Sequence, residues 1–230
     1  KSPLDERRLI RVIEEACTGL EDVSPEPILA ETRRNLYDGI TRDELALAPI
    51  MAARTLIEQE PNYAYVSARL LLDKLRREAL SYVHGRAEQP TQAEMAAGYA
   101  EYFPAYVAAG IEAELLDPEL GRFDLTRLAA ALKPERDLKF QFLGLKTLYD
   151  RYFLHVRGVR FELPQAFFMR VAMGLAVREI DREARAIEFY DLMSSFDFMC
   201  STPTLFNAGT THPQLSSCFL TTVPDDLDGI

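Results

Sequence analysis

Two hydroxyl residues near the C-terminal end of the sequence, Thr202 and Ser217, are of a type that can bind an anion. Each lies beside a predicted turn, and a hydroxyl with neighbouring backbone N–H groups can form a concave site for a phosphate group. The ordinary alternative is that a Thr before Pro203 and a Ser in a strand are turn and edge residues without a ligand. The residue types alone leave both interpretations open.

A cysteine and an acidic pair follow in the same stretch: Cys218, then Asp225 and Asp226. An isolated cysteine in a predicted strand is most often a small buried hydrophobic residue. An Asp at a strand end can cap a following helix, and its carboxylate is also a strong acceptor for a hydroxyl donor. The two roles of the Asp are compatible, because a cap and a ligand contact can use the backbone and the side chain of one residue.

The elements that would hold these residues differ from the rest of the chain. Residues 201–230 break the helical pattern with turn signals at 202–203 and 207–210, where Pro, Asn and Gly favour turn conformations. Residues 215–223 are rich in aromatic and β-branched types and predict a strand, which Pro224 ends. We therefore expect turns and one strand here, preceded by helices.

Composition restricts the class of protein. The chain has 230 residues, 48% of them hydrophobic, and a net charge of −10, which argues against binding to duplex DNA. We find no apolar run long enough for a membrane helix and no signal peptide, so we expect a cytoplasmic protein. Its three cysteines are too scattered for a disulfide framework or a zinc site, and no metal site is expected.

Residues 1–83 predict a small helical bundle. Asp5 is placed to cap the first helix, and Thr41 with Glu44 forms a capping box at the start of the third. Pro61 opens a fourth helix. Pro49 predicts a kink or a later start of the third helix, because it removes a backbone hydrogen bond at a cost of roughly 3 kcal/mol.

Residues 84–200 predict a helical scaffold that begins after a polar, turn-rich boundary. A second capping box at Thr91 and Glu94 opens a helix, and Pro104 is expected to start a separate one. A hairpin is expected over residues 152–161 around Arg157-Gly158, followed by helices over about 164–177 and 182–195.

Three motifs near the C-terminal end carry a resemblance to a known family: STPTLFNAGT at 201–210, SSCFL at 216–220 and DDLDGI at 225–230. In this order, and after the helical run FELPQAFFMRVAMGLA at 161–176, they resemble the large subunit of class I ribonucleotide reductase. The resemblance implies a mainly α chain with an ATP-cone-like bundle over 1–83 and a helical domain over 84–200. Residues 201–230 would then begin a ten-stranded α/β barrel.

By this resemblance the protein is an oxidoreductase that reduces ribonucleoside diphosphates to deoxyribonucleoside diphosphates. Thr202, Ser217 and Cys218 match substrate-binding positions, and Cys218 matches a redox-active cysteine. A pair of thiols that closes to a disulfide can supply the two electrons needed at the sugar. In the family the partner cysteine lies on a later strand, so the present sequence alone is expected to be inactive.

The resemblance also implies regulation by nucleotides. Asp225, Asp226 and Leu227 match the start of a specificity site for ATP or deoxynucleoside triphosphates at a dimer interface. In the bundle, Asp5, Arg8 and Arg77 match polar or basic positions that contact ATP or dATP in the family's ATP-cone.

Two residues indicate that this cone is degenerate, because Arg42 and Ala46 replace a usual threonine and histidine. The family's basic hairpin before the first helix is missing or cut away in a sequence that begins at Lys1. We therefore favour a bundle kept for packing or subunit contact over a working effector site.

The implied partners are a dimetal, radical-generating small subunit, thioredoxin or glutaredoxin as reductant, and a second copy of the large subunit. Two alternatives remain at this point. One is the adenosylcobalamin-dependent class II reductase, whose motifs are similar. The other is a non-catalytic helical module that binds nucleotides.

Overall fold

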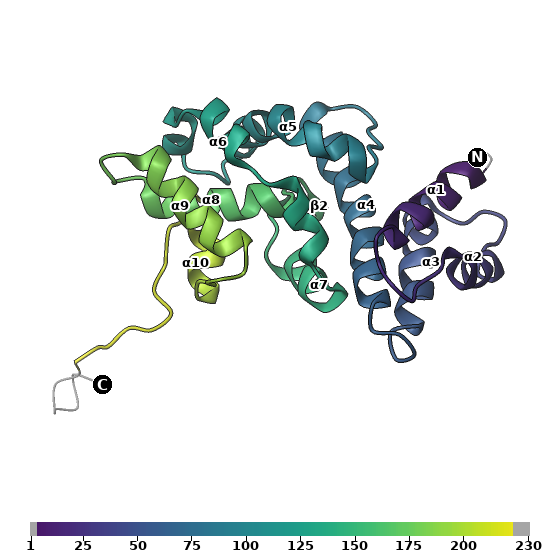
Figure 1. The fold of residues 1–230 in the computed structure, drawn as a ribbon. Helices are drawn as coiled ribbons and strands as arrows, with labels where there is room; N and C mark the ends of the chain where they lie inside the picture. The colour runs from purple at the N-terminus through teal and green to yellow at the C-terminus, as the bar shows by residue number, and fades with distance from the viewer. Residues whose placement is uncertain (1–3, 223–230) are drawn as a thin grey trace, which may run out of the picture.

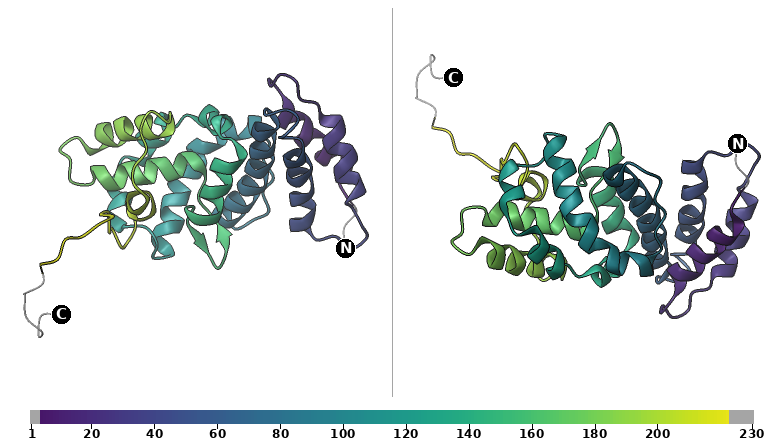
Figure 2. Two further views of the ribbon diagram at one scale, coloured as in Figure 1. Left: turned by 90° about the horizontal axis from the view of Figure 1, so that it is seen from below. Right: turned by 90° about the horizontal axis from the view of Figure 1, so that it is seen from above.

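The computed structural model describes residues 4–222, and most of them lie in helices. Figure 1 shows α1, α2 and α3 at one end of an elongated body, with α4 between them and the remaining helices. Figure 2 shows the same order from two other directions, with the C-terminal stretch leading away from the far end. The prediction of a mainly α chain is confirmed.

The first four helices are α1 (Glu6–Cys17), α2 (Pro25–Arg34), α3 (Arg42–Thr55) and α4 (Tyr63–His84). The Asp5 side chain accepts a hydrogen bond from the Arg8 backbone, and both hydrogen bonds of the Thr41–Glu44 capping box are present. The expected later start of α3 is wrong, because the helix begins at Arg42 and runs unbroken through Pro49. Pro49 is buried in the bundle, where packing offsets its missing hydrogen bond.

Helix α4 packs against both groups of helices. It packs against α1 and α3 on one side and against α5, α7 and β2 on the other. It ends at Gly85, whose φ of 65° is a left-handed helix cap. A division between residues 83 and 84 stays a prediction, since α4 belongs to the cores of both groups of helices.

The second group is built from helices and one small hairpin. In chain order its elements are α5 (Gln92–Glu112), η1 (Pro118–Arg122), α6 (Leu125–Ala131), η2 (Pro134–Lys139), α7 (Phe142–Arg151), β1 (His155–Val156), β2 (Val159–Arg160), α8 (Pro164–Ala176), α9 (Arg182–Ser194) and α10 (Thr202–Asn207).

The expectation that Pro104 starts a separate helix is wrong. One helix, α5, runs through Pro104, and the Thr91–Glu94 capping box begins it as predicted. The proline costs roughly 3 kcal/mol. Burial of aromatic side chains on both sides of it contributes about 1.5–3 kcal/mol each, which is enough to keep the helix whole; these are Tyr99, Tyr102, Phe103 and Tyr106.

The predicted hairpin is confirmed. Strands β1 and β2 pair antiparallel, with Val156 opposite Val159. Arg157 and Gly158 between them have φ values of 51° and 85°. Two successive positive φ values are typical of a type I′ turn, whose twist matches that of the paired strands.

Helix α8 lies at the centre of the second group and packs along α9 (Figure 1). Nearly every residue of α8 is buried, including Gln165 and Arg170. The predicted helices over 164–177 and 182–195 are confirmed with small differences at their ends.

The described part of the C-terminal stretch differs from expectation at two places. Residues 202–203 do not form a turn but begin α10, because a proline in the first helical turn needs no hydrogen-bond partner. Residues 215–222 form no strand. A strand is stabilised by pairing with a neighbour, and among residues 4–222 none lies beside this segment. The turn at 207–210 is confirmed by the hydrogen bond from the Thr210 backbone to the Asn207 carbonyl. The described residues do not include the expected barrel, since their one sheet has two strands.

Two glycines let α8 and the segment after α10 approach closely. A Cβ atom on Gly174 would lie 2.1 Å from the Gly209 backbone nitrogen. A Cβ atom on Gly209, whose φ is 75°, would lie 2.7 Å from the Arg170 carbonyl oxygen. The backbones touch here, so no larger residue fits without moving one of them.

A buried polar network joins α5, η2, α8 and α9. Asp137 accepts hydrogen bonds of 2.7 Å from the Tyr99 hydroxyl and from the Gln165 amide, and Tyr190 donates to Gln165 at 2.6 Å. Burial raises the pKa of the Asp137 carboxyl from its ordinary 3.8 to about 6, although its hydrogen bonds and the Arg76 charge act to lower it.

Replacing Gly174 with Ala should lower the free energy of unfolding of the 230-residue chain by about 1–3 kcal/mol, because the added methyl group overpacks this contact. The matched control is Gly144→Ala in α7, where a Cβ atom meets nothing within 4 Å. It should raise the free energy of unfolding by about 0.5–1 kcal/mol, since Ala is the better helix former. Urea unfolding followed by circular dichroism measures both, and equal effects would contradict the close approach.

The raised pKa of Asp137 predicts a pH dependence of stability. Because the folded state binds this proton more tightly, the stabilisation is complete below pH 3.8 and is lost as the pH rises through about 6. Relative to Asp137→Asn, the chain should lose about 2.4 kcal/mol of unfolding free energy between pH 4 and pH 7. The exposed Asp38→Asn variant is the control, and the pH-dependent loss that comes from Asp137 should persist in it.

Candidate functional site

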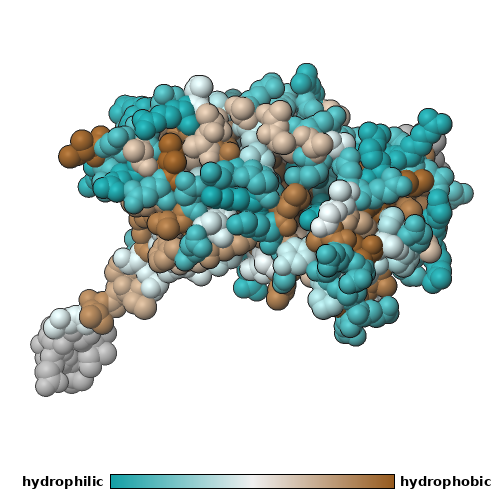
Figure 3. All heavy atoms as spheres, viewed as in Figure 1, coloured by the Kyte–Doolittle hydropathy of each residue, from teal (hydrophilic) through white to brown (hydrophobic). Residues whose placement is uncertain are grey.

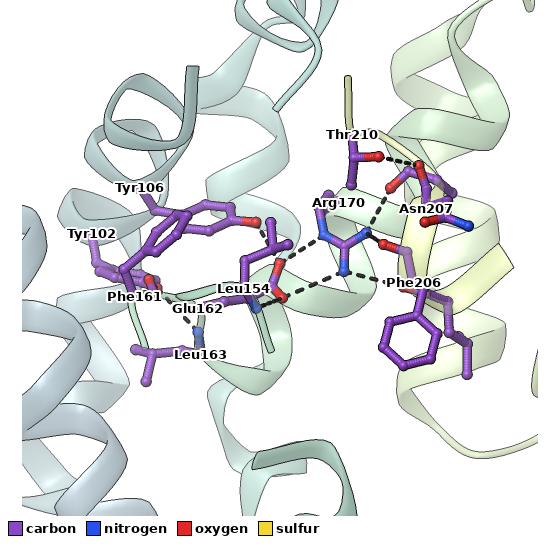
Figure 4. A network of polar contacts seen from close by, with 12 residues as sticks. Tyr102, Tyr106, Leu154, Phe161, Glu162, Leu163, Arg170, Phe206, Asn207 and Thr210 are labelled. Carbon is purple, nitrogen blue, oxygen red and sulfur yellow. Dashed lines mark hydrogen bonds and ion pairs between the residues drawn. The ribbon is translucent and has the colours of Figure 1, made fainter. Parts of the chain in front are cut away.

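A buried ion pair anchors the segment that carries the predicted site residues. Arg170 on α8 donates from Nε to Glu162 Oε1 at 2.7 Å, and neither side chain is exposed. Figure 4 shows Arg170 between Glu162 on one side and the chain around α10 on the other. Two charges removed from water cost several kcal/mol each, so the pair is stable only if its remaining donors and acceptors are satisfied.

The other two nitrogens of Arg170 donate hydrogen bonds to backbone carbonyls at the C-terminal end of α10. Nη1 donates to the Ala208 carbonyl at 2.6 Å, and Nη2 donates to the Leu205 carbonyl at 3.2 Å. The last carbonyls of a helix have no partner within it, and a buried one needs a donor from elsewhere. Arg170 therefore fixes the end of α10 against the middle of α8.

The carboxylate oxygens of Glu162 also have further hydrogen-bond partners. Glu162 accepts a 2.5 Å hydrogen bond from the Tyr106 hydroxyl and one of 3.0 Å from the Leu154 backbone. Burial, followed by the Glu162 charge, raises the pKa of Tyr106 well above its ordinary value, so Tyr106 stays a donor. Burial is the largest single influence on the pKa of Arg170 and acts to lower it, but the charge and hydrogen bond of Glu162 together with Tyr106 outweigh burial, so the pKa is raised.

The turn after α10 is held from a second side. Asp117 donates its backbone N–H to the Gly209 carbonyl at 3.1 Å, and Thr211 donates to the Leu115 carbonyl at 3.2 Å. These bonds flank an antiparallel bridge between Leu116 and Thr210. The chain from Thr202 to Thr211 is thus fixed between α8 and the end of α5.

Thr202 is the first residue of α10 and is exposed. Its hydroxyl lies 3.1 Å from the hydroxyl of Tyr152, at the end of α7. Side chains of α10 hold the following chain as far as Leu215: Asn207 donates to the Gln214 carbonyl and Thr204 donates to the Leu215 carbonyl.

Ser217 and Cys218 lie beyond this attachment, and both are exposed. Among residues 4–222, no hydrogen bond joins either of them to Thr202. Cys218 is a free thiol, and the alternative that it is a small buried residue is wrong. Figure 3 shows the C-terminal stretch leading away from the body, with apolar residues along it. Phe219 and Leu220, which follow Cys218 in the sequence, are exposed.

Asp225, Asp226 and Leu227 lie outside the described residues. Their assignment to a specificity site stays a prediction.

Two of the three residues predicted to bind an effector in the bundle, Asp5 and Arg8, already have structural partners. Asp5 caps α1, and Arg8 makes a two-fold hydrogen bond to the carboxylate of Asp73 on α4, at 2.9 and 3.1 Å. Arg77 is half-buried one helical turn after Asp73. The Arg8 charge is therefore compensated within the bundle, which is consistent with a packing role.

Sequence reasoning missed Arg170, Glu162 and Tyr152. The signal for the first was present, because a lone arginine inside the apolar run 161–176 must find a carboxylate when it is buried. Nothing in the sequence indicates that its other partners are carbonyls some 35–38 positions later.

Comparison with known proteins identifies the helical part. Residues 138–213 match the family model described as the all-alpha domain of ribonucleotide reductase. This span includes the Arg170–Glu162 pair and all of α10.

The whole chain is also similar to curated proteins. It is 45% identical over 97% of its length to the ribonucleoside-diphosphate reductase subunit alpha of Chlamydia muridarum. It is 36% identical over 99% of its length to the subunit alpha of Helicobacter pylori, and 36% identical over 95% to the large subunit of Danio rerio.

The fold and the anchored segment thus define an all-alpha ribonucleotide reductase domain. The chain belongs to the family of ribonucleoside-diphosphate reductase large subunits and corresponds to their N-terminal region. It spans 21%, 27% and 26% of the length of these three relatives. No helix within residues 4–222 is both long and apolar enough to cross a membrane.

Replacing Arg170 with Met should lower the free energy of unfolding by about 3–5 kcal/mol, because it leaves Glu162 buried without its partner. Adding Glu162→Gln should recover part of the loss, since a neutral amide costs less to bury than a carboxylate. Arg185→Met, which breaks an exposed pair with Glu188, is the control and should change the stability far less, because water screens an exposed pair. An Arg170→Met variant as stable as this control in urea unfolding would contradict the anchoring role.

Proposed function

We propose that this chain is part of a ribonucleotide reductase large subunit that reduces ribonucleoside diphosphates to deoxyribonucleoside diphosphates in the cytoplasm, for DNA synthesis. The observation that carries the proposal is the exposed thiol of Cys218, which follows an anchored segment in a chain 45% identical to a subunit of that name. Within it, residues 1–83 would form a cone-like bundle, 84–200 the helical domain and 201–230 the entry to a catalytic barrel.

In the proposed reaction, two thiols lose two hydrogen atoms and join as a disulfide. The ribose C2′–O bond breaks, the oxygen leaves as water, and a hydrogen takes its place on the carbon. Cys218 supplies one thiol, and thioredoxin or glutaredoxin then reduces the disulfide by thiol exchange.

The second thiol would come from the rest of the protein, because the other two cysteines of the chain are poorly placed to form a disulfide with Cys218. Cys17 is buried, which raises the pKa of its thiol to about 11. Cys200 is half-buried, its pKa is likewise raised by burial, and its sulfur lies 3.7 Å from that of Met193. Both therefore hold their protons more tightly than an ordinary thiol, and both sulfurs are less accessible than the exposed thiol of Cys218 with which a partner must join.

Radical initiation is proposed to come from a separate dimetal small subunit. Among residues 4–222, no group of three or more His, Cys, Asp or Glu side chains is placed to hold a metal ion. In this proposal the large subunit contributes substrate binding and the reducing thiols.

Substrate and effectors are assigned by the same reasoning. The exposed hydroxyls of Thr202 and Ser217 would donate to the substrate diphosphate. Asp225, Asp226 and Leu227 would contact ATP or a deoxynucleoside triphosphate at the interface of a dimer. The Arg8–Asp73 pair supports a structural bundle rather than an ATP or dATP switch.

Replacing Cys218 with Ser in the full-length protein, assayed with its small subunit and a dithiol reductant, should abolish turnover, because a serine cannot form the disulfide. Binding of ribonucleoside diphosphates should be retained. Cys200→Ser is the matched control and should turn over. Normal turnover by Cys218→Ser would remove the redox assignment.

Replacing Asp225 with Ala in the full-length protein should leave turnover intact but weaken the effect of bound nucleotides on which substrate is reduced. The reason is the loss of a charged acceptor for an effector hydroxyl. Competition assays with mixed substrates, with and without each effector, measure this preference. Asp228→Ala in the same motif is the control, and an unchanged preference in both variants would contradict the specificity-site assignment.

A further inference from the structure

Tyr152 touches the predicted substrate-binding residue Thr202 from a different element. It follows the last residue of α7, and its hydroxyl oxygen lies 3.1 Å from Thr202 Oγ1. Thr202 is exposed at the start of α10, where its hydroxyl would otherwise rotate freely about its side-chain bonds. The contact therefore gives this hydroxyl a defined direction.

The Tyr152 ring is itself held in place. It stacks on Phe206 with ring centres 4.4 Å apart and an angle of 9° between the rings. It also meets the buried Phe167 of α8 edge-on, at 6.4 Å. Aromatic pairs in these geometries are worth about 0.5–1.5 kcal/mol beyond the area they bury.

The two contacts with α10 act together. Phe206 lies four residues after Thr202, so the two side chains share one face of the helix. The stack on Phe206 sets the position of the ring, and the ring sets the position of the hydroxyl that meets Thr202.

This arrangement leaves the Thr202 proton available. A threonine hydroxyl has one donor and two acceptor positions. When Tyr152 donates to Thr202 Oγ1, the Thr202 hydroxyl can donate onward to a phosphate oxygen. Hydrogen bonds in such a chain polarise and strengthen one another.

We propose that Tyr152 is a positioning residue that orients the Thr202 hydroxyl toward the diphosphate of the substrate. The inference rests on the proposed function, because it assumes that Thr202 binds that diphosphate.

The test uses the full-length protein with its small subunit and CDP as the substrate. Tyr152→Phe removes the hydroxyl but keeps the ring stacked on Phe206. We expect KM for CDP to rise about 2- to 10-fold, the effect of one lost hydrogen bond. The change in kcat should be much smaller, since a diphosphate contact is made in the ground state and the transition state alike. Tyr65→Phe, which removes a hydroxyl that accepts from Gln141, is the control and should leave KM unchanged.

A double-variant cycle separates positioning from a general structural effect. In a Thr202→Val background, Tyr152→Phe should cause no further rise in KM, because the hydroxyl that it orients is gone. The same rise in both backgrounds would overturn the proposal, as would an unchanged KM in Tyr152→Phe itself.

Failure of the proposed function would look different. If the unaltered protein does not reduce CDP, both proposals fall. If Thr202→Val leaves KM unchanged, the assignment of Thr202 and the role of Tyr152 fall together. If Thr202→Val raises KM and Tyr152→Phe does not, only the positioning role is wrong.

Discussion

The buried pair of Arg170 and Glu162 is the constraint on which the position of the candidate site residue Thr202 depends. A charged pair without exposure is costly, and here each side-chain nitrogen of Arg170 and each carboxylate oxygen of Glu162 has a hydrogen-bond partner. Glu162 is bound by Tyr106 of α5 and by the Leu154 backbone, while Arg170 binds carbonyls at the end of α10. The pair thus joins the core of the helical domain to the segment that carries the motifs.

Close backbone packing completes the anchor. Gly174 and Gly209 allow α8 to touch the turn after α10, and the bridge between Leu116 and Thr210 holds that turn from the other side. As a result Thr202 has a fixed place on the surface, whereas the thiol of Cys218 lies on an exposed stretch beyond the last attachment at Leu215. The chain thus carries a fixed hydroxyl at Thr202 and an accessible thiol at Cys218.

Local signals in the sequence predicted local structure well. The capping boxes at Thr41 and Thr91 and the hairpin at Arg157-Gly158 depend on neighbouring residues and were confirmed. Pro104 was misjudged because burial of aromatic side chains outweighs a local break. The strand expected after Leu215 failed because a strand needs a partner, which no local pattern supplies. The motifs identified the candidate site residues, but the partners of Arg170 and Tyr152 are distant in sequence and only the fold reveals them.

The central claim is that Cys218 is one half of the reducing dithiol. It is tested most directly by a single turnover of the full-length protein and its small subunit on a ribonucleoside diphosphate, without external reductant, followed by alkylation and peptide mapping. The account predicts that the peptide with Cys218 becomes disulfide-linked in proportion to the deoxyribonucleotide formed. Deoxyribonucleotide formed while Cys218 stays fully alkylatable would contradict it.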